Sequence, residues 1–131
     1  MKELEKSVVL SIFAIFFVIS LLFYWQLAPT ESKMAASKLV HLDFEVFGRV
    51  QGVFFRKYTQ QKAKSIDIRG WIRNTRQNTV QGELEGETNT IETMKNWLRK
   101  EGSPSSRIDR AVFKNEREIQ EYSYSGFSIK H

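Results

Sequence analysis

Cysteine is absent from this chain of 131 residues. Its absence excludes disulfides, thiolate nucleophiles and zinc sites built from cysteine. Histidine is scarce as well: the two copies are His41 and the C-terminal His131, and neither has a second histidine at metal-ligand spacing. A Ser-His-Asp triad and a histidine-rich metal centre are therefore not expected. Any chemistry must come from arginine, amides, carboxylates, backbone N–H groups and water.

The charge balance is basic but does not identify a partner. The 20 Lys and Arg residues exceed the 15 Asp and Glu residues, which gives a formal net charge of +5. This excess is compatible with nucleic acid, an anionic membrane surface or a small anionic substrate. The choice among these three depends on where particular residues lie.

Charged residues are also missing from Val8 to Trp25. A helix of this length nearly spans the hydrocarbon core of a bilayer, which is about 30 Å thick, and Tyr24 and Trp25 fall where an interfacial aromatic belt belongs. Residues 1–28 are predicted to be an uncleaved N-terminal membrane anchor, followed by a polar linker over residues 29–37. A cleaved signal peptide is the competing interpretation, but its apolar core normally spans only about 7–15 residues and ends at a small-x-small site.

The remaining residues, 38–131, are predicted to form one domain. Alternation over residues 39–48 predicts a half-buried strand with His41, Asp43 and Glu45 facing outward. A helix is predicted over residues 54–65, and two further strands, over residues 65–75 and 79–87, form a hairpin. Four aromatic residues are expected in or near the core: Phe54, Phe55, Trp71 and Trp97.

A second helix is predicted over residues 89–101, with Asn89 and Glu92 in capping-box positions and Gly102 as its stop. Strands are predicted over residues 108–113 and 122–129. The order strand, helix, strand, strand, helix, strand is typical of a ferredoxin-like fold, an α+β two-layer sandwich in which two helices cover one face of an antiparallel sheet.

The stretch "GRVQGVFFR" joins the first strand to the first helix of this domain. Gly48 and Gly52 can reach positive φ at little cost, so the loop can turn successive N–H groups inward around an anion. A helix that starts directly after the loop adds the positive end of its dipole, and Arg56 could hold the same anion with two hydrogen bonds. The alternative is that the glycines only serve the turn and that the arginine only aids solubility.

RNA binding is the other function that a basic ferredoxin-like domain suggests. RNA-recognition modules display aromatic side chains on the open face of the sheet. Here the outward positions of the strand over residues 79–87 are Gln81, Glu83 and Glu85. Carboxylates repel a phosphate backbone and offer no surface for base stacking, so no nucleic-acid partner is expected.

Several motifs in one order carry a more specific resemblance: "FGRVQGVFFR", "GWIRNT", "TVQGELEG", "WL" and "GSPSSRID". With these motifs, residues 44–129 resemble the acylphosphatase family of small hydrolases. The resemblance implies hydrolysis of the carboxyl-phosphate bond of acyl phosphates to a carboxylate and inorganic phosphate, without a metal or another cofactor. It also implies a catalytic role for Arg56, which holds the phosphate, and for Asn74, which orients the attacking water.

The same resemblance implies that the loop residues bind the substrate phosphate through backbone N–H groups; these are Gly48, Arg49, Val50, Gln51, Gly52 and Val53. The chain departs from the family pattern at Asn78, where the hairpin turn usually has glycine, and asparagine tolerates the left-handed conformation better than most residues. An alternative function is a catalytically weak domain of the same fold that binds a phosphate-bearing ligand or a protein partner. The expected partners of the enzyme are the acyl phosphate, inorganic phosphate as product and inhibitor, and the membrane, and the protein is expected to be a monomer.

The domain is expected to face the cytoplasm as part of a single-pass membrane protein. The resemblance implies substrates that are cytosolic metabolites. A cysteine-free domain is also compatible with a reducing compartment. No asparagine has serine or threonine two positions later, so the glycosylation acceptor pattern is absent. The flanking lysines do not decide the orientation, because Lys2 and Lys6 balance Lys33 and Lys38.

Overall fold

The computed structural model describes residues 2–27 and 37–131 of the chain. The chain divides into two compact units, Met1–Ala36 and Ser37–His131, which are described separately. The linker predicted over residues 29–37 lies outside the described residues, except for Ser37.

The N-terminal unit contains one long apolar helix, α1 (Lys2–Leu27). Its 22-residue segment Glu5–Gln26 has a mean hydropathy of 2.6 and no buried side chains, so it is long and apolar enough to cross a membrane. The helix extends beyond the predicted apolar run at both ends.

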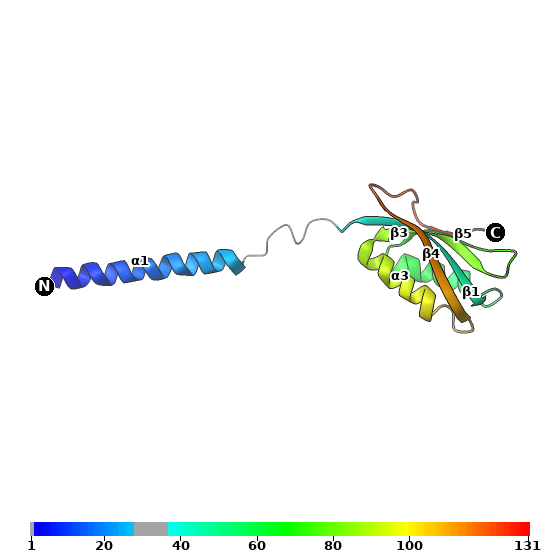
Figure 1. Cartoon of the computed structure of the whole chain (residues 1–131), viewed down its shortest axis with the longest axis horizontal. Helices are drawn as coiled ribbons and strands as arrows, with labels where there is room; N and C mark the ends of the chain where they lie inside the picture. The colour runs from blue at the N-terminus through cyan, green and yellow to red at the C-terminus, as the bar shows by residue number, and fades with distance from the viewer. Residues whose placement is uncertain (1, 28–36) are drawn as a thin grey trace. The chain divides into compact units, whose positions relative to one another are not determined.

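The second unit is a five-stranded sheet with two helices, in the order β4-β1-β3-β2-β5 (Figure 1). Its elements are β1 (Leu39–Arg49), α2 (Phe55–Ser65), β2 (Arg69–Asn74), β3 (Val80–Glu87), α3 (Thr88–Lys100), β4 (Arg107–Ile119) and β5 (Phe127–Ile129). All neighbouring strands are antiparallel except β2 and β5, which run parallel. The predicted ferredoxin-like α+β fold is confirmed, with β5 added at the edge next to β2.

The core lies between the sheet and the two helices, which cover the same face (Figure 1). Alternate residues of β1 enter it, and Leu42 and Val46 are fully buried. Phe55 from α2 and Leu98 from α3 pack into the same cluster. Burial of this apolar surface is the main force that holds the helices to the sheet.

The opposite face of the sheet is polar, as predicted, but one part of it is covered. His41 is 3% exposed and Glu85 is 0% exposed. The segment that leads to β5 lies over them, and the backbone N–H groups of Ser123 and Tyr124 both donate to Glu85 Oε1. Burial alone would raise the pKa of Glu85, but hydrogen bonds from His41 and from these two N–H groups outweigh it and leave the pKa below its usual value.

Several predicted boundaries were wrong. The second helix of the domain begins at Thr88, its N-cap is Glu87 and no side chain caps it, so the capping box of Asn89 and Glu92 does not form. The strand predicted over residues 122–129 is only the three-residue β5, whereas β4 runs on to Ile119. Edge strands are set by pairing with their neighbours, which short apolar patterns do not reveal.

Candidate active site

The loop between β1 and α2 adopts the backbone that its two glycines allow. Gly48 has a φ of +131° and Gly52 a φ of +73°, as the sequence predicted. Gly48 also lies against β4: a Cβ at this position would be 2.1 Å from the carbonyl oxygen of Arg107. A Cβ at Gly52 would meet nothing within 4 Å, so only its backbone angle requires glycine there. Gly48 is therefore required by its backbone angle and by its close approach to β4, whereas Gly52 is required by its backbone angle alone.

Phe54, the last loop residue, corrects one prediction. It was expected in or near the core, but 72% of it is exposed. Its φ is 60°, a left-handed conformation that is unusual for a bulky residue, and it is the N-cap residue of α2. Such strain persists where the surrounding structure fixes the backbone, and it is frequent at ligand-binding sites.

Free backbone N–H groups accumulate in this loop. None of the N–H groups of residues 50–54 donates a hydrogen bond to another residue in the described part of the chain. The first N–H groups of α2 add to this set, because the first turn of a helix leaves its N–H groups without helical partners. A concave loop with unpaired N–H groups ahead of a helix N-terminus is an arrangement that binds phosphate.

A hollow of about 450 Å³ opens at this junction, and it brings together residues that are distant in sequence. Both predicted catalytic residues line it: Arg56, the second residue of α2, and Asn74, the last residue of β2. Gly52 and Val50 contribute from the loop. No acidic side chain is among the described residues that line the hollow, so its side-chain charge is positive.

The sequence analysis missed five lining residues: Phe54, Phe55, Lys57, Ile129 and His131. Lys57 could have been found, since it follows Arg56 directly on the helix. Ile129 and His131 could not, because they reach the hollow only through the parallel pairing of β5 with β2. The backbone N–H of Lys130 donates to the carbonyl of Ile72 and fixes the end of the chain beside Asn74.

Asn74 carries a buried polar atom without a partner. Its side-chain carbonyl oxygen, Oδ1, is inaccessible to solvent and accepts no hydrogen bond from any residue that the structure describes. An unsatisfied buried acceptor costs about 1–3 kcal/mol, so its retention calls for an explanation. A bound water or ligand in the hollow would provide the missing donor.

Gln51 connects the loop to the β2–β3 hairpin. Its Nε2 donates to the carbonyl oxygens of Thr75 and Thr79, both at 2.8 Å. Thr79 in turn donates to Glu45 Oε2 at 2.6 Å, which fixes the hairpin to β1. Gln51 was predicted to bind substrate; its side chain is engaged with the hairpin, so only its backbone N–H is available to an anion.

The other loop residues contribute in the same way. Val50 and Val53 are 1% and 6% exposed, so their side chains belong to the core and only their backbones can meet an anion. Arg49 is exposed at the end of β1. Asn78 in the hairpin turn has a φ of 65°, which confirms that asparagine takes the left-handed position.

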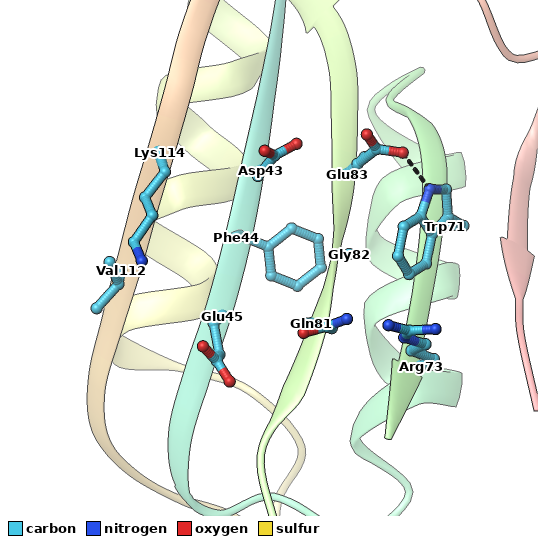
Figure 2. A pocket seen from close by; sticks show the side chains of 10 residues that line it. All are labelled: Asp43, Phe44, Glu45, Trp71, Arg73, Gln81, Gly82, Glu83, Val112 and Lys114. Carbon is cyan, nitrogen blue, oxygen red and sulfur yellow. Dashed lines mark hydrogen bonds between the residues drawn. The ribbon is translucent and has the colours of Figure 1, made fainter. Parts of the chain in front are cut away.

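A second hollow, of about 400 Å³, lies over the sheet and contains none of the predicted site residues (Figure 2). Its lining mixes acidic residues such as Asp43 and Glu83 with Arg73 and Lys114. Trp71 lies here as well and donates its indole N–H to Glu83. The carboxylates make this hollow unsuited to an anionic substrate.

The fold and the first hollow together define an anion-binding domain, in which a strand-to-helix loop, an arginine and an amide converge on one small cavity. Comparison with known proteins gives the family. The sequence model described as Acylphosphatase matches residues 42–129. The chain belongs to the acylphosphatase family.

Curated relatives and a solved structure agree with this assignment. Acylphosphatase-2 of Meleagris gallopavo is 52% identical over 97 residues, which cover 74% of this chain and 94% of the relative. Acylphosphatase-2 of Homo sapiens is 51% identical over 96 residues, covering 73% of this chain and 97% of the relative. The crystal structure of acylphosphatase from Bacillus subtilis aligns with a TM-score of 0.65 at 30% identity, covering 70% of this chain and 99% of that one.

Replacement of Gly48 by alanine should destabilise the domain strongly. The new Cβ would collide with the backbone of β4 and would hold alanine at a φ that it rarely adopts, so the free energy of unfolding should fall by more than about 2 kcal/mol. Chemical denaturation of the full chain in detergent measures the loss. Gly126→Ala is the matched control, because a Cβ there meets nothing within 4 Å, and it should change stability by less than about 0.5 kcal/mol. Equal stability of the two variants would contradict the close contact with β4.

Proposed function

We propose that Arg56 and the loop from Gly48 to Val53 hold the phosphoryl group while Asn74 orients the water, in the acyl phosphate hydrolysis that family membership assigns to this chain. The reaction yields a carboxylate and inorganic phosphate. The observation that carries the proposal is the convergence of Arg56, Asn74 and a loop of free N–H groups on one hollow without acidic side chains.

The groups proposed to bind the anion are the Arg56 guanidinium and backbone N–H groups, which are positively charged or partly positive before the substrate arrives. The guanidinium of Arg56 can donate two parallel hydrogen bonds to phosphoryl oxygens, and arginine stays cationic at every working pH. The N–H groups of the loop and the first turn of α2 surround the other oxygens. Because these donors are fixed before the substrate arrives, little reorganisation is needed as negative charge develops in the transition state.

The chemical step needs a positioned water more than a strong nucleophile. The water oxygen forms a bond to phosphorus as the bond from phosphorus to the acyl oxygen breaks, and the carboxylate leaves with the electron pair. A carboxylate is weakly basic and requires little help from a general acid. Asn74 suits the orienting role because its amide can accept and donate without changing its charge, and its buried Oδ1 lacks a donor within the domain.

We also propose that the apolar segment of α1 anchors the enzyme in a membrane as a single-pass protein, with the domain in the cytoplasm. The length and composition of Glu5–Gln26 support the anchor. The absence of cysteine and of glycosylation acceptor patterns from the sequence supports the cytoplasmic side. The domain is proposed to act as a monomer.

Arg56→Lys should lose most of the activity. Lysine keeps the charge but not the planar pair of donors, so turnover of a simple acyl phosphate should fall by about 10²–10³. Hydrolysis by the purified full chain in detergent provides the measurement. Arg117→Lys, the same change at an exposed position of β4, is the control and should keep its activity. Near-normal turnover of Arg56→Lys would show that only the charge at this position matters.

Asn74→Ala should separate turnover from phosphate binding. The water loses its orienting group, so the rate falls, whereas inorganic phosphate still meets Arg56 and the loop and should inhibit with a nearly unchanged constant. Asn96→Ala on the exposed side of α3 is the control for both readouts. A large loss of phosphate affinity would instead make Asn74 part of the anion site.

Protease treatment of intact membrane vesicles should reveal the side on which the domain lies. In vesicles that expose the cytoplasmic face, the domain should be digested without detergent, while a lumenal marker protein stays protected. Protection of the domain until detergent is added would contradict the cytoplasmic placement. Recovery of the uncleaved full chain in the soluble fraction would contradict the anchor itself.

A further inference from the structure

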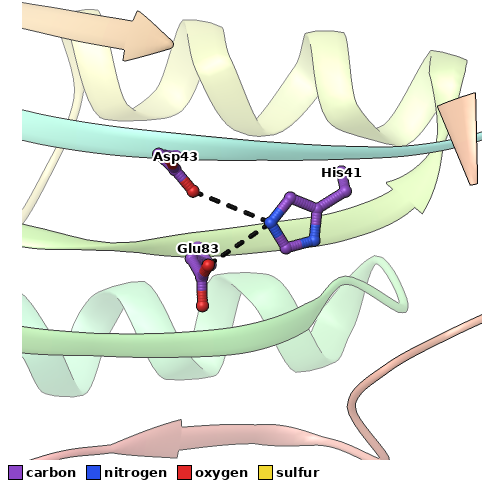
Figure 3. Close-up of side chains that lie close together, drawn as sticks. All are labelled: His41, Asp43 and Glu83. Carbon is purple, nitrogen blue, oxygen red and sulfur yellow. Dashed lines mark ion pairs between the residues drawn. The ribbon is translucent and has the colours of Figure 1, made fainter. Parts of the chain in front are cut away.

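A histidine and two carboxylates converge on the face of the sheet opposite the helices, apart from the proposed active site (Figure 3). His41 and Asp43 come from β1 and Glu83 from the neighbouring β3. His41 Nε2 lies 3.4 Å from Glu83 Oε1 and 3.7 Å from Asp43 Oδ1. One ligand atom of each residue lies within 4.8 Å of the other two. None of these three residues lines the hollow that contains Arg56 and Asn74.

The second oxygen of each carboxylate is held from outside the cluster. Asn115 donates its side-chain N–H to Asp43 Oδ2 at 2.7 Å. Trp71 and Tyr124 both donate to Glu83 Oε2. In each carboxylate the other oxygen, Oδ1 or Oε1, is therefore the one that faces His41 Nε2.

His41 is fixed in the same manner. Its Nδ1 lies 2.7 Å from Glu85 Oε2, and the Glu85 side chain is wholly buried. If Nδ1 carries the proton and donates it to this carboxylate, Nε2 presents its lone pair to the centre of the cluster. The His41 side chain is only 4% exposed, and its Nε2 faces Asp43 Oδ1 at 3.7 Å and Glu83 Oε1 at 3.4 Å. An imidazole that one carboxylate orients through Nδ1, and whose Nε2 faces two further carboxylate oxygens, is an arrangement in which histidine can bind a metal.

We propose that His41 Nε2, Asp43 Oδ1 and Glu83 Oε1 bind a divalent transition-metal ion, with zinc as the best fit. Metal–ligand bonds of roughly 2.0–2.2 Å in tetrahedral geometry place neighbouring ligand atoms about 3.3–3.6 Å apart. The two separations from His41 Nε2, 3.4 and 3.7 Å, are close to this range before any adjustment to an ion. Water takes the fourth position.

The donor set selects the class of ion. Magnesium and calcium bind oxygen ligands and gain little from an imidazole, whereas one nitrogen and two carboxylate oxygens suit zinc and its first-row neighbours. Charge favours a dication too, since Asp43, Glu83 and Glu85 form no ion pair with a lysine or arginine within the described part of the chain. Across the β1–β4 pair, Lys114 lies opposite Asp43 and Arg117 lies opposite His41.

An ion can reach the cluster from solvent. Asp43 and Glu83 also line the hollow over the sheet, and they remain partly exposed, with side-chain exposures of 39% and 26%. The ion would link β1 to β3 on the face of the sheet that has no helix. We therefore assign it a structural role, in which it raises stability and leaves turnover unchanged.

Zinc titration of the purified full chain in detergent, followed by calorimetry and thermal unfolding, tests the site. Wild type should bind one ion per chain, and its Tm should rise by roughly 10–20 °C when zinc is about a hundredfold above its dissociation constant. Magnesium and calcium should cause no comparable shift. Cobalt should bind with visible d–d absorption bands. Removal of zinc by a chelator should reverse the rise in Tm while hydrolysis of an acyl phosphate continues at the same rate.

Variants identify the ligands. Asp43→Asn and Glu83→Gln should each weaken zinc binding at least tenfold, and both positions are exposed enough for the fold to tolerate the change. His41→Gln should abolish binding while its amide can still donate to Glu85. Asp109→Asn, at an exposed position of β4, and His131→Ala, which removes the other histidine, are the controls and should bind zinc as wild type does.

Two results would overturn the proposal. If the wild type binds no zinc at micromolar concentration, His41, Asp43 and Glu83 form no metal site and only contact one another across the two strands. If His131→Ala loses the ion while His41→Gln keeps it, the ion binds at the end of the chain and not at this cluster.

Discussion

The two hydrogen bonds from the Gln51 amide to the carbonyls of Thr75 and Thr79 are the constraint on which the proposed active site depends. They join the anion-binding loop, which follows β1, to the hairpin that carries Asn74 at the end of β2. Arg56 lies on α2 and Asn74 is paired with Val80 of β3, so these hydrogen bonds fix the loop that lies between the two residues. With them, the loop N–H groups and the Asn74 amide hold one geometry before substrate binds, and in the proposed mechanism such preorganisation lowers the barrier to reaction.

The domain uses its surfaces for different chemistry because their charges differ. The junction of the loop with α2 combines free N–H groups, the helix N-terminus and cationic side chains, which suits an anion. The open face of the sheet carries carboxylates on β1 and β3, which suits a cation and repels a phosphate. The segment around Tyr124 covers part of that face and buries His41 and Glu85. The result is one domain with two polar sites that share no residue.

Much of the fold follows from local pattern. The alternation of apolar and polar residues along β1 identifies the side chains that enter the core, because residues two apart on a strand share one face. The apolar periodicity of α2 and α3 does the same, because residues that recur about every 3.6 positions share one face of a helix. The spaced motifs around Gly48 and Asn74 were enough to name Arg56 and Asn74 as candidates. The sequence pattern could not show that the Phe54 side chain lies outside the core, since an aromatic residue just before a helix can face either the core or the solvent. It also could not show that the capping box of Asn89 and Glu92 would be displaced by a start at Thr88.

The sequence by itself determined the absence of thiol chemistry, the apolar N-terminal helix, the order of elements and the positive φ of two glycines, because these depend on side-chain type and on neighbours along the chain. Only the tertiary structure decided what meets across the sheet. The parallel pairing of β5 with β2 brings His131 to the hollow, and the register of β1 with β3 sets Glu83 beside His41 and Asp43. Contacts of this kind join residues that are tens of positions apart in the sequence. Strand pairing fixes these contacts, and no local sequence pattern specifies that pairing.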